Sequence, residues 1–225
     1  MSVDIIIPTT FEPTLTYECI KSIQNIVKEP EYKFMIIDNM STPAFQVPND
    51  KQIRVKRYEE RLGFAKSMNE GIRSTDGEYI LLLNNDTVIY QPEFLTSMIE
   101  VINSRDDIAI VSPTCDFIGT PTAKVPNMDA RPNDIYENNG HVAAVCWLIK
   151  RSTIDKIGMF DENYKIGAFE DGDYCHRVLH AGMKIYLDRR IWIKHYGSRT
   201  VSRTPGYYQT FHQNHIYFEK KWGIQ

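Results

Sequence analysis

Three stretches of the chain that are predicted to be buried strands each end in residues able to bind a ligand. The strands are residues 3–7, 32–38 and 79–83, and the residues at their ends are Pro8-Thr9, Asp38-Asn39 and Asn84-Asn85-Asp86. Any one of these groups could simply form a turn. In a parallel sheet, however, the carboxyl ends of the strands share one edge, where ligands bind. Together the residues favour a site in which an aspartate and amides hold a divalent cation that also binds phosphates.

A second group of acids lies in the sequence AFEDGDYCHR, residues 168–177. Glu170, Asp171 and Asp173 fall at the start of a helix predicted from about Asp171 to His180. Acids in a first helical turn are stabilised by the helix dipole, so capping is one explanation. Carboxylates this close also raise one another's pKa, which suits a general base. Further along, His195 follows a predicted strand and precedes an exposed turn, which makes a metal-binding role plausible.

The sequence RLGFAKSMNEG, residues 61–71, places Arg61 and Lys66 beside Gly63 at the start of a predicted helix. Main-chain amides and the dipole at such a position favour anions. The alternative is an amphipathic helix with a solvated basic face. Neither G-x-G-x-x-G nor G-x-x-x-x-G-K-[ST] occurs in the chain, which argues against a dinucleotide cofactor and a P-loop nucleotide site.

The elements that must position these residues alternate between strand and helix through the first 110 residues. This order predicts a doubly wound, mostly parallel α/β sheet. The second half is less regular, with predicted strands at 108–111, 142–149, 183–187 and 191–194. The segment 112–139 between them is predicted to be a functional or mobile loop. The last segment, 206–223, repeats aromatic residues at helical spacing, and predicts a helix that packs on the sheet domain or, less simply, forms a lid over the site.

Composition narrows the possible functions. The chain has 225 residues, a net charge of -3 and a pI near 6.1, which fits one domain and argues against nucleic-acid binding through bulk charge. Four cysteines without a C-x-x-C pair predict a reducing compartment and no thiolate zinc site. No apolar run approaches the roughly 20 residues of a membrane span, so we expect a cytoplasmic protein without a transmembrane segment.

The chain resembles the GT-A fold glycosyltransferases of family two. The segments that carry the resemblance are IIIPTT, MIIDNMS, RLGFAKSMNEGIRSTDGEYILLLNNDT, WLIKRSTIDKIGMFDENY, FEDGDYCHR, AGMKIY and HYGSRT. They occur in the family's order between about residues 3 and 200, and the N-N-D version is most similar to bacterial rhamnosyltransferases. The resemblance implies a single GT-A domain over residues 1–225 with a smaller acceptor-side subregion. Residues 1–110 would bind the nucleotide sugar, 111–205 the acceptor and catalytic groups, and 206–225 would form a C-terminal helix.

The resemblance also implies roles for individual residues. Asp86 matches the carboxylate that holds a divalent metal, Mn²⁺ or Mg²⁺, and His195 matches a histidine that completes the metal sphere. Asp171 matches the catalytic base, with Glu170 beside it. Asn84 departs from the acidic first position of the family's D-x-D motif. The implied donor-binding residues are Pro8, Thr9, Asp38, Gly63, Lys66, Asn84, Asn85 and Arg199, and the implied acceptor-binding residues are Trp147 and Asp173.

The function implied by the resemblance is the transfer of one sugar from a UDP- or dTDP-sugar to a hydroxyl of a glycan or glycoconjugate, with inversion, in polysaccharide biosynthesis. The Q-x-x-R-W pattern of processive synthases is absent. One alternative is a sugar-phosphate nucleotidyltransferase, although PTTFEPT lacks the Gly- and Arg-rich loop that would grip a triphosphate. The other is a nucleotide-sugar-binding domain without catalysis; the N-N-D asparagines favour it, and the intact FEDGDYCHR and His195 oppose it.

Overall fold

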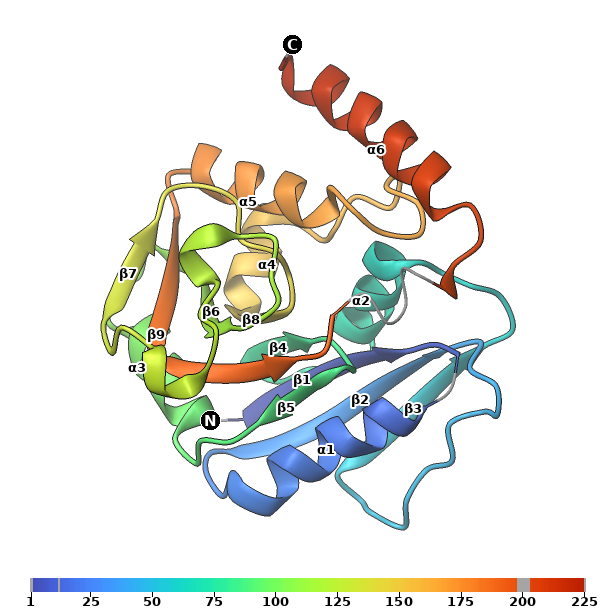
Figure 1. The fold of residues 1–225 in the computed structure, drawn as a ribbon, viewed down its shortest axis with the longest axis vertical. Helices are drawn as coiled ribbons and strands as arrows, with labels where there is room; N and C mark the ends of the chain where they lie inside the picture. Colours follow the sequence, from blue (N-terminus) through green and yellow to red (C-terminus); the bar gives the residue numbers. More distant parts are fainter. Residues whose placement is uncertain (1, 12, 198–202, 225) are drawn as a thin grey trace.

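The computed structural model describes residues 2–11, 13–197 and 203–224 (Figure 1). Within these ranges, nine strands form one sheet in the order β3-β2-β1-β4-β8-β6-β9-β5, and β7 pairs with β9. The strands are β1 (Ser2–Thr9), β2 (Glu31–Asn39), β3 (Ile53–Tyr58), β4 (Tyr79–Leu83), β5 (Thr87–Ile89), β6 (Ile108–Cys115), β7 (Ile135–Asn138), β8 (Cys146–Lys150) and β9 (Lys184–His195). The α-helices are α1 (Thr14–Ile26), α2 (Phe64–Arg73), α3 (Phe94–Asn103), α4 (Arg151–Ile157), α5 (Glu170–His180) and α6 (Tyr207–Trp222).

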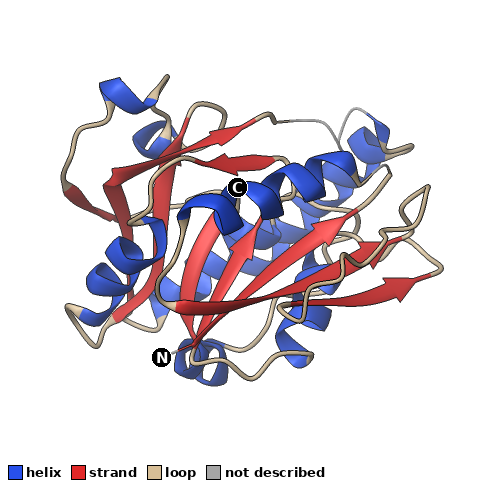
Figure 2. Cartoon of the chain, turned by 90° about the horizontal axis from the view of Figure 1, so that it is seen from below, coloured by secondary structure: helices blue, strands red, loops and turns tan. Residues whose placement is uncertain are grey.

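The first half of the chain forms the parallel part of the sheet, as predicted. β3, β2, β1 and β4 run parallel, and the register pairs Thr9 with Asp38 at the carboxyl ends of β1 and β2. All five residues of β4 are buried, which explains its unbroken apolar sequence. Helix α2 packs on β1 and β2, and the strands cross the middle of the molecule with helices packed around them (Figure 2). The carboxyl ends of β1, β2 and β4 therefore share one edge.

The second half continues the same sheet with antiparallel strands. β8 lies between β4 and β6 and runs antiparallel to both, whereas β6 and β9 are parallel. The two strands predicted at 183–187 and 191–194 are one continuous strand, β9, whose register against β6 shifts between Pro113 and Thr114. The segment 112–139, predicted to be a functional or mobile loop, also contains regular structure: the end of β6, two 3-10 turns (Pro121–Ala123 and Met128–Ala130) and β7. The short elements β5 and α4 were not predicted.

The predicted C-terminal helix is present as α6, and it packs on the helical part of the domain. It lies across α5 and the segment before it, and extends away from the strands (Figure 1). Its aromatic stripe packs there: Phe211, His215 and Phe218 contact Phe169, and Trp222 contacts His176. Among the residues that the structure describes, no helix is both long and apolar enough to cross a membrane.

Candidate active site

A cleft of about 760 Å³ lies over the carboxyl ends of the parallel strands. Its volume is within the range of small-molecule sites, roughly 300–1,000 Å³. The sequence-predicted residues that line it are Pro8, Thr9, Gly63, Asn84, Asn85, Asp86, Glu170, Asp171 and His195. Residues from distant parts of the chain therefore meet at this cleft, with β1 and β4 on one side and the start of α5 on the other.

Short strand β5 explains how Asp86 meets His195. Thr87, the residue after Asp86, pairs with His195 in the antiparallel ladder between β5 and β9, and the Tyr196 amide donates to the Asp86 carbonyl at 2.9 Å. The His195 Nε2 atom then lies 3.1 Å from the Asp86 Oδ1 atom, and both side chains are almost fully buried. The other ring nitrogen, Nδ1, contacts the Phe117 carbonyl, which fixes the orientation of the ring.

The electrostatics of this pair favour a cation. Burial lowers the pKa of His195, but the hydrogen bond to Asp86, an interaction with Cys115 and the Asp86 charge together raise it to about 10. A carboxylate oxygen and an imidazole nitrogen thus face each other in a setting that favours positive charge, and both are ligands that a divalent cation can take. Within the described residues the pair is not part of a group of three or more His, Cys, Asp or Glu side chains that could hold a metal ion. The donor set fits a metal that takes its other ligands from phosphate oxygens or water.

The start of α5 places Asp171 on the opposite side of the cleft. One carboxylate oxygen, Oδ1, accepts from the Gly172 amide at 2.8 Å. The other, Oδ2, accepts from the Ala144 amide and from His141 Nε2, each at 3.3 Å. Burial raises the pKa of Asp171, but the His141 interaction and the two amides outweigh it and lower the pKa. Asp171 is therefore ionised at neutral pH and able to accept a proton.

Glu170, the neighbour of Asp171, has the opposite electrostatics. Its side chain is 5% exposed, and its Oε2 atom has no hydrogen-bond partner among the described residues. Burial and the charge of Asp171 raise its pKa to about 8. The prediction that the clustered acids raise one another's pKa therefore applies to Glu170 and was wrong for Asp171. At neutral pH the pair consists of one protonated and one ionised carboxyl group.

Four other predicted residues are not brought to the cleft. Asp38 is fully buried, and its carboxylate accepts from the Ser41 and Phe45 amides and from Arg57. Lys66 is exposed and lies 3.4 Å from Glu60. Trp147 is fully buried in the core, where it stacks on Phe160, and so does not face an acceptor.

Asp173, the fourth of these residues, is also fully buried, so it does not contact an acceptor in this structure either. It binds Arg177 at 3.0 Å, and two residues of α6, Lys221 at 2.7 Å and Trp222 at 3.1 Å. Arg199, predicted to bind the donor, lies outside the described residues.

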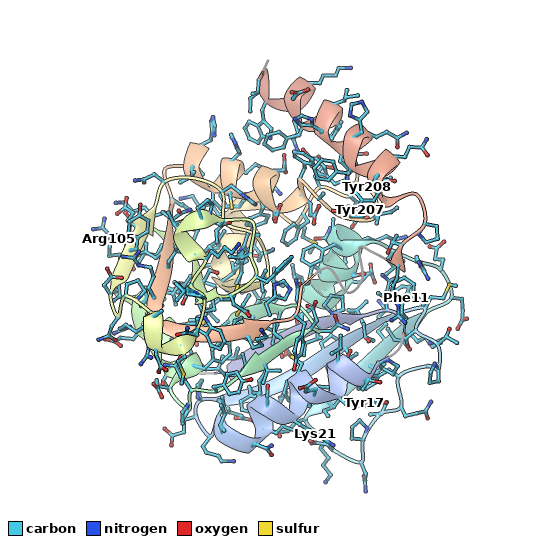
Figure 3. The ribbon with its side chains drawn as sticks, in the orientation of Figure 1. Phe11, Tyr17, Lys21, Arg105, Tyr207 and Tyr208 are labelled. Carbon is cyan, nitrogen blue, oxygen red and sulfur yellow. The ribbon has the colours of Figure 1, made fainter. Side chains whose placement is uncertain are left out.

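The structure also adds residues that sequence reasoning did not assign to the site. His141 contacts Asp171 from the loop before β8. Tyr207 lines the cleft at the start of α6, near α2 (Figure 3). Burial raises the pKa of Tyr207, and the charges of Glu170 and Asp171 raise it further. No sequence pattern distinguished His141. In α6 the sequence did contain a signal of a polar contact, because Asn214 is a polar residue on the aromatic, buried face of the helix.

Comparisons with known proteins agree with this geometry. Residues 4–158 match the sequence profile described as glycosyl transferase family 2. A dolichol-phosphate mannosyltransferase from Pyrococcus furiosus is 26% identical over 117 residues, which cover 50% of this chain and 33% of that relative. The chain thus spans about a third of the length of this curated relative.

Solved structures are similar over almost the whole chain. A structure of GalNAc-T7 with UDP, GalNAc and Mn²⁺ matches with a TM-score of 0.75 and 13% identity, covering 97% of this chain and 48% of the other. The mannosyltransferase PcManGT from Pyrobaculum calidifontis, in complex with GDP-Man and Mn²⁺, matches with a TM-score of 0.66 and 15% identity, covering 99% and 71%. These likenesses confirm the predicted GT-A fold.

Proposed function

Because the chain belongs to glycosyl transferase family 2, we propose that it transfers a single sugar from a nucleotide-diphosphate donor to an acceptor hydroxyl. The observation that carries this proposal is the cleft itself. It joins a buried carboxylate–imidazole pair, suited to a cation on a diphosphate, with an ionised aspartate on the opposite side. We assign residues 1–110 to donor binding and 111–205 to the acceptor side.

On the donor side, Thr9 and the segment Asn84–Asp86 lie where a nucleoside diphosphate would rest against the strand ends. Thr9 is held by the Thr16 hydroxyl at 2.6 Å, and the Asn85 amide group donates to the same hydroxyl at 3.1 Å. These contacts fix the floor of the cleft before any ligand binds. Such preorganisation reduces the entropy cost of binding. The donors we expect are UDP- or dTDP-sugars.

Asp86 and His195 would hold the divalent cation, Mn²⁺ or Mg²⁺. When bound, the cation would supply positive charge beside the diphosphate leaving group. Asn84 provides an amide instead of a carboxylate, so Asp86 supplies the carboxylate charge of the N-N-D segment. The two solved neighbours named above contain Mn²⁺, which supports this choice of metal.

Asp171 would act as the general base. The acceptor oxygen forms a bond to the anomeric carbon while its proton passes to the Asp171 carboxylate. The bond between that carbon and the diphosphate oxygen breaks, and its electron pair leaves with the nucleoside diphosphate. Attack from the face opposite the leaving group inverts the anomeric configuration. His141 and two amides hold the Asp171 carboxylate in place for this step.

We propose that the acceptor is a hydroxyl of a glycan or glycoconjugate and that the reaction belongs to polysaccharide biosynthesis. The four cysteines are free and buried, which supports a reducing compartment such as the cytoplasm.

The test is release of nucleoside diphosphate from a panel of UDP-, dTDP- and GDP-sugars, with and without Mn²⁺ and without an added acceptor. Slow, metal-dependent hydrolysis of one donor is expected. No hydrolysis and no binding of any donor would contradict the proposal. Release of pyrophosphate from a nucleoside triphosphate and a sugar phosphate would identify a nucleotidyltransferase instead.

A further inference from the structure

Helix α6 contacts the loop before the proposed catalytic acids through a buried side chain, Asn214. Asn214 is 3% exposed, and among the described residues of α6 it alone is buried. Its Nδ2 amide lies within hydrogen-bond distance of three main-chain carbonyls, those of Lys165 (3.0 Å), Gly167 (3.2 Å) and Ala168 (3.0 Å). Its Oδ1 atom accepts from the Lys165 amide at 3.2 Å. One side chain thus satisfies main-chain groups of a whole loop.

The loop that Asn214 holds has an unusual backbone. Ile166, Ala168 and Phe169 have φ angles of 61°, 87° and 73°, in the left-handed region that side chains other than glycine rarely adopt. For a β-branched residue such as Ile166 this conformation is a genuine outlier. Such residues are strained and persist only where surrounding contacts enforce the conformation. The loop therefore depends on external contacts for its shape.

Further contacts hold the same loop from two sides. From α2, the Phe64 amide donates to the Ile166 carbonyl at 2.7 Å. From α6, the Phe169 ring stacks on His215 with centroids 5.0 Å apart, and also contacts Phe211 and Phe218. Asn214 lies between these aromatic residues on the same face of α6. The helix thus fixes the side chain of Phe169 and the main chain before it.

The loop leads directly into the proposed catalytic acids. Phe169 is the last residue before α5, and its carbonyl accepts from the Asp173 amide at 2.8 Å, which begins the helix. Glu170 and Asp171 are the first two residues of α5. Lys165, Ile166, Gly167 and Ala168 themselves line the cleft. A shift of this loop would therefore displace both carboxyl groups and the neighbouring wall of the cleft.

We propose that Asn214 is a positioning residue for glycosyl transfer. Its amide holds the strained loop 165–169 in the one shape that presents Glu170 and Asp171 to the acceptor, and α6 acts as a clasp on the acceptor side of the cleft. This proposal rests on the proposed function, because the loop is given a role in that reaction. The role of α6 is to hold the loop and not to contact the transferred sugar.

The test compares Asn214→Ala with Gln213→Ala, a change of an exposed amide side chain at the adjacent position of the same helix. With the nucleotide sugar that the unaltered protein hydrolyses, kcat of Asn214→Ala is expected to fall about 10- to 100-fold, since misplacement by about 1 Å can cost 10²-fold. The Kd for UDP with Mn²⁺, measured by calorimetry, should change less than about threefold. Gln213→Ala should match the unaltered protein in both measurements.

Hydrogen exchange followed by mass spectrometry tests the clasp without any assay of activity. Peptides covering residues 163–173 should exchange at least about tenfold faster in Asn214→Ala than in Gln213→Ala, while β1 and β4 keep their protection. If the alanine variant does not fold, Asn214→Ser, which keeps one donor and one acceptor, takes its place and should show a smaller loss.

The outcomes separate the two proposals. Unchanged exchange of 163–173 overturns the clasp, whatever the activity. So does a kcat within twofold of the unaltered protein, or an equal loss of donor affinity and kcat. If the unaltered protein acts on no nucleotide sugar, the proposed function fails, and faster exchange in Asn214→Ala still supports the clasp.

Discussion

The two sides of the cleft are built by different means. On the donor side, Thr9 ends the parallel strand β1, and Asp86 lies between β4 and β5, so strand pairing sets their positions. On the acceptor side, Glu170 and Asp171 follow a loop with left-handed residues, held by the main-chain amide of Phe64 from α2 and by side chains of α6. The donor side is thus part of the sheet, whereas the acceptor side depends on contacts distant in sequence. Substitutions on the two sides should therefore have separable effects on donor affinity, turnover and stability.

The largest effect is expected from Asp171→Asn. The substitution keeps the shape of the side chain but removes the group that accepts the proton, and a general base typically contributes about 10²–10⁴-fold. We expect kcat to fall by this factor with little change in donor Kd. Asp155→Asn, an exposed change on α4, is the matched control. Turnover within threefold of the unaltered protein, with folding intact, would exclude Asp171 as the base.

Asp86→Ala tests the donor side, where the expected effect is on binding of the nucleotide and not on turnover. Losing the carboxylate that pairs with His195 should weaken Mn²⁺-dependent binding of the nucleoside diphosphate by about 10²-fold or more, because the cation would lose one of its two proposed protein ligands. Calorimetry with UDP, with and without Mn²⁺, measures the effect, and exposed Asp106→Asn serves as control. If Asp86→Ala kept the Mn²⁺ dependence of the unaltered protein, the metal assignment would be wrong.

The difference in construction between the two sides of the cleft also explains which parts of the site could be predicted from the sequence. Apolar runs followed by polar residues predicted β1, β2 and β4 and the edge they share, because a buried parallel strand has a clear local pattern. The meeting of Asp86 and His195 depends on β5, which has three residues and too short a pattern to detect. The loop 165–169 could not be predicted either, since Ile166 and Phe169 contradict the local preference for negative φ and need α6 to hold them. Local patterns thus predicted the strand ends of the donor side, whereas pairing and packing between distant segments decide how Asp86 meets His195 and how the acceptor side is held.

Gly63 connects the two sides, and its substitution should affect stability. Its φ is +79°, and a Cβ atom would lie 2.8 Å from the main-chain nitrogen of Ile166. Gly63→Ala is expected to cost roughly 1–3 kcal/mol from backbone strain alone. For a protein of this size that lowers Tm by about 2–4 °C per kcal/mol. Gly119→Ala is the control, since a Cβ there meets no atom within 4 Å. Equal Tm values for the two variants would show that the loop does not need this close approach.

The smallest effect should come from Glu170→Gln, and it should depend on pH. The folded-state pKa of Glu170 is raised to about 8, above the roughly 4.3 of an unfolded glutamate. Between these values the folded state binds the extra proton, so this group's contribution to stability is complete below about pH 4 and is lost as pH rises through about 8. Glutamine mimics the protonated form of Glu170 and cannot ionise, so Glu170→Gln does not lose this contribution to stability at high pH.

The difference in Tm should therefore grow with pH: the two proteins should have similar Tm values near pH 4.5, and Glu170→Gln should be more stable by about 3 °C or more at pH 8.5. Asp171, His141 and Tyr207 face or neighbour this group and are present in both proteins, so their titration largely cancels in the difference. Exposed Glu31→Gln is the control and should give the same difference from the unaltered protein at both pH values. A constant difference for Glu170→Gln would mean that Glu170 is already ionised near neutral pH. The acceptor side would then present two carboxylates to the sugar, instead of one acid and one base.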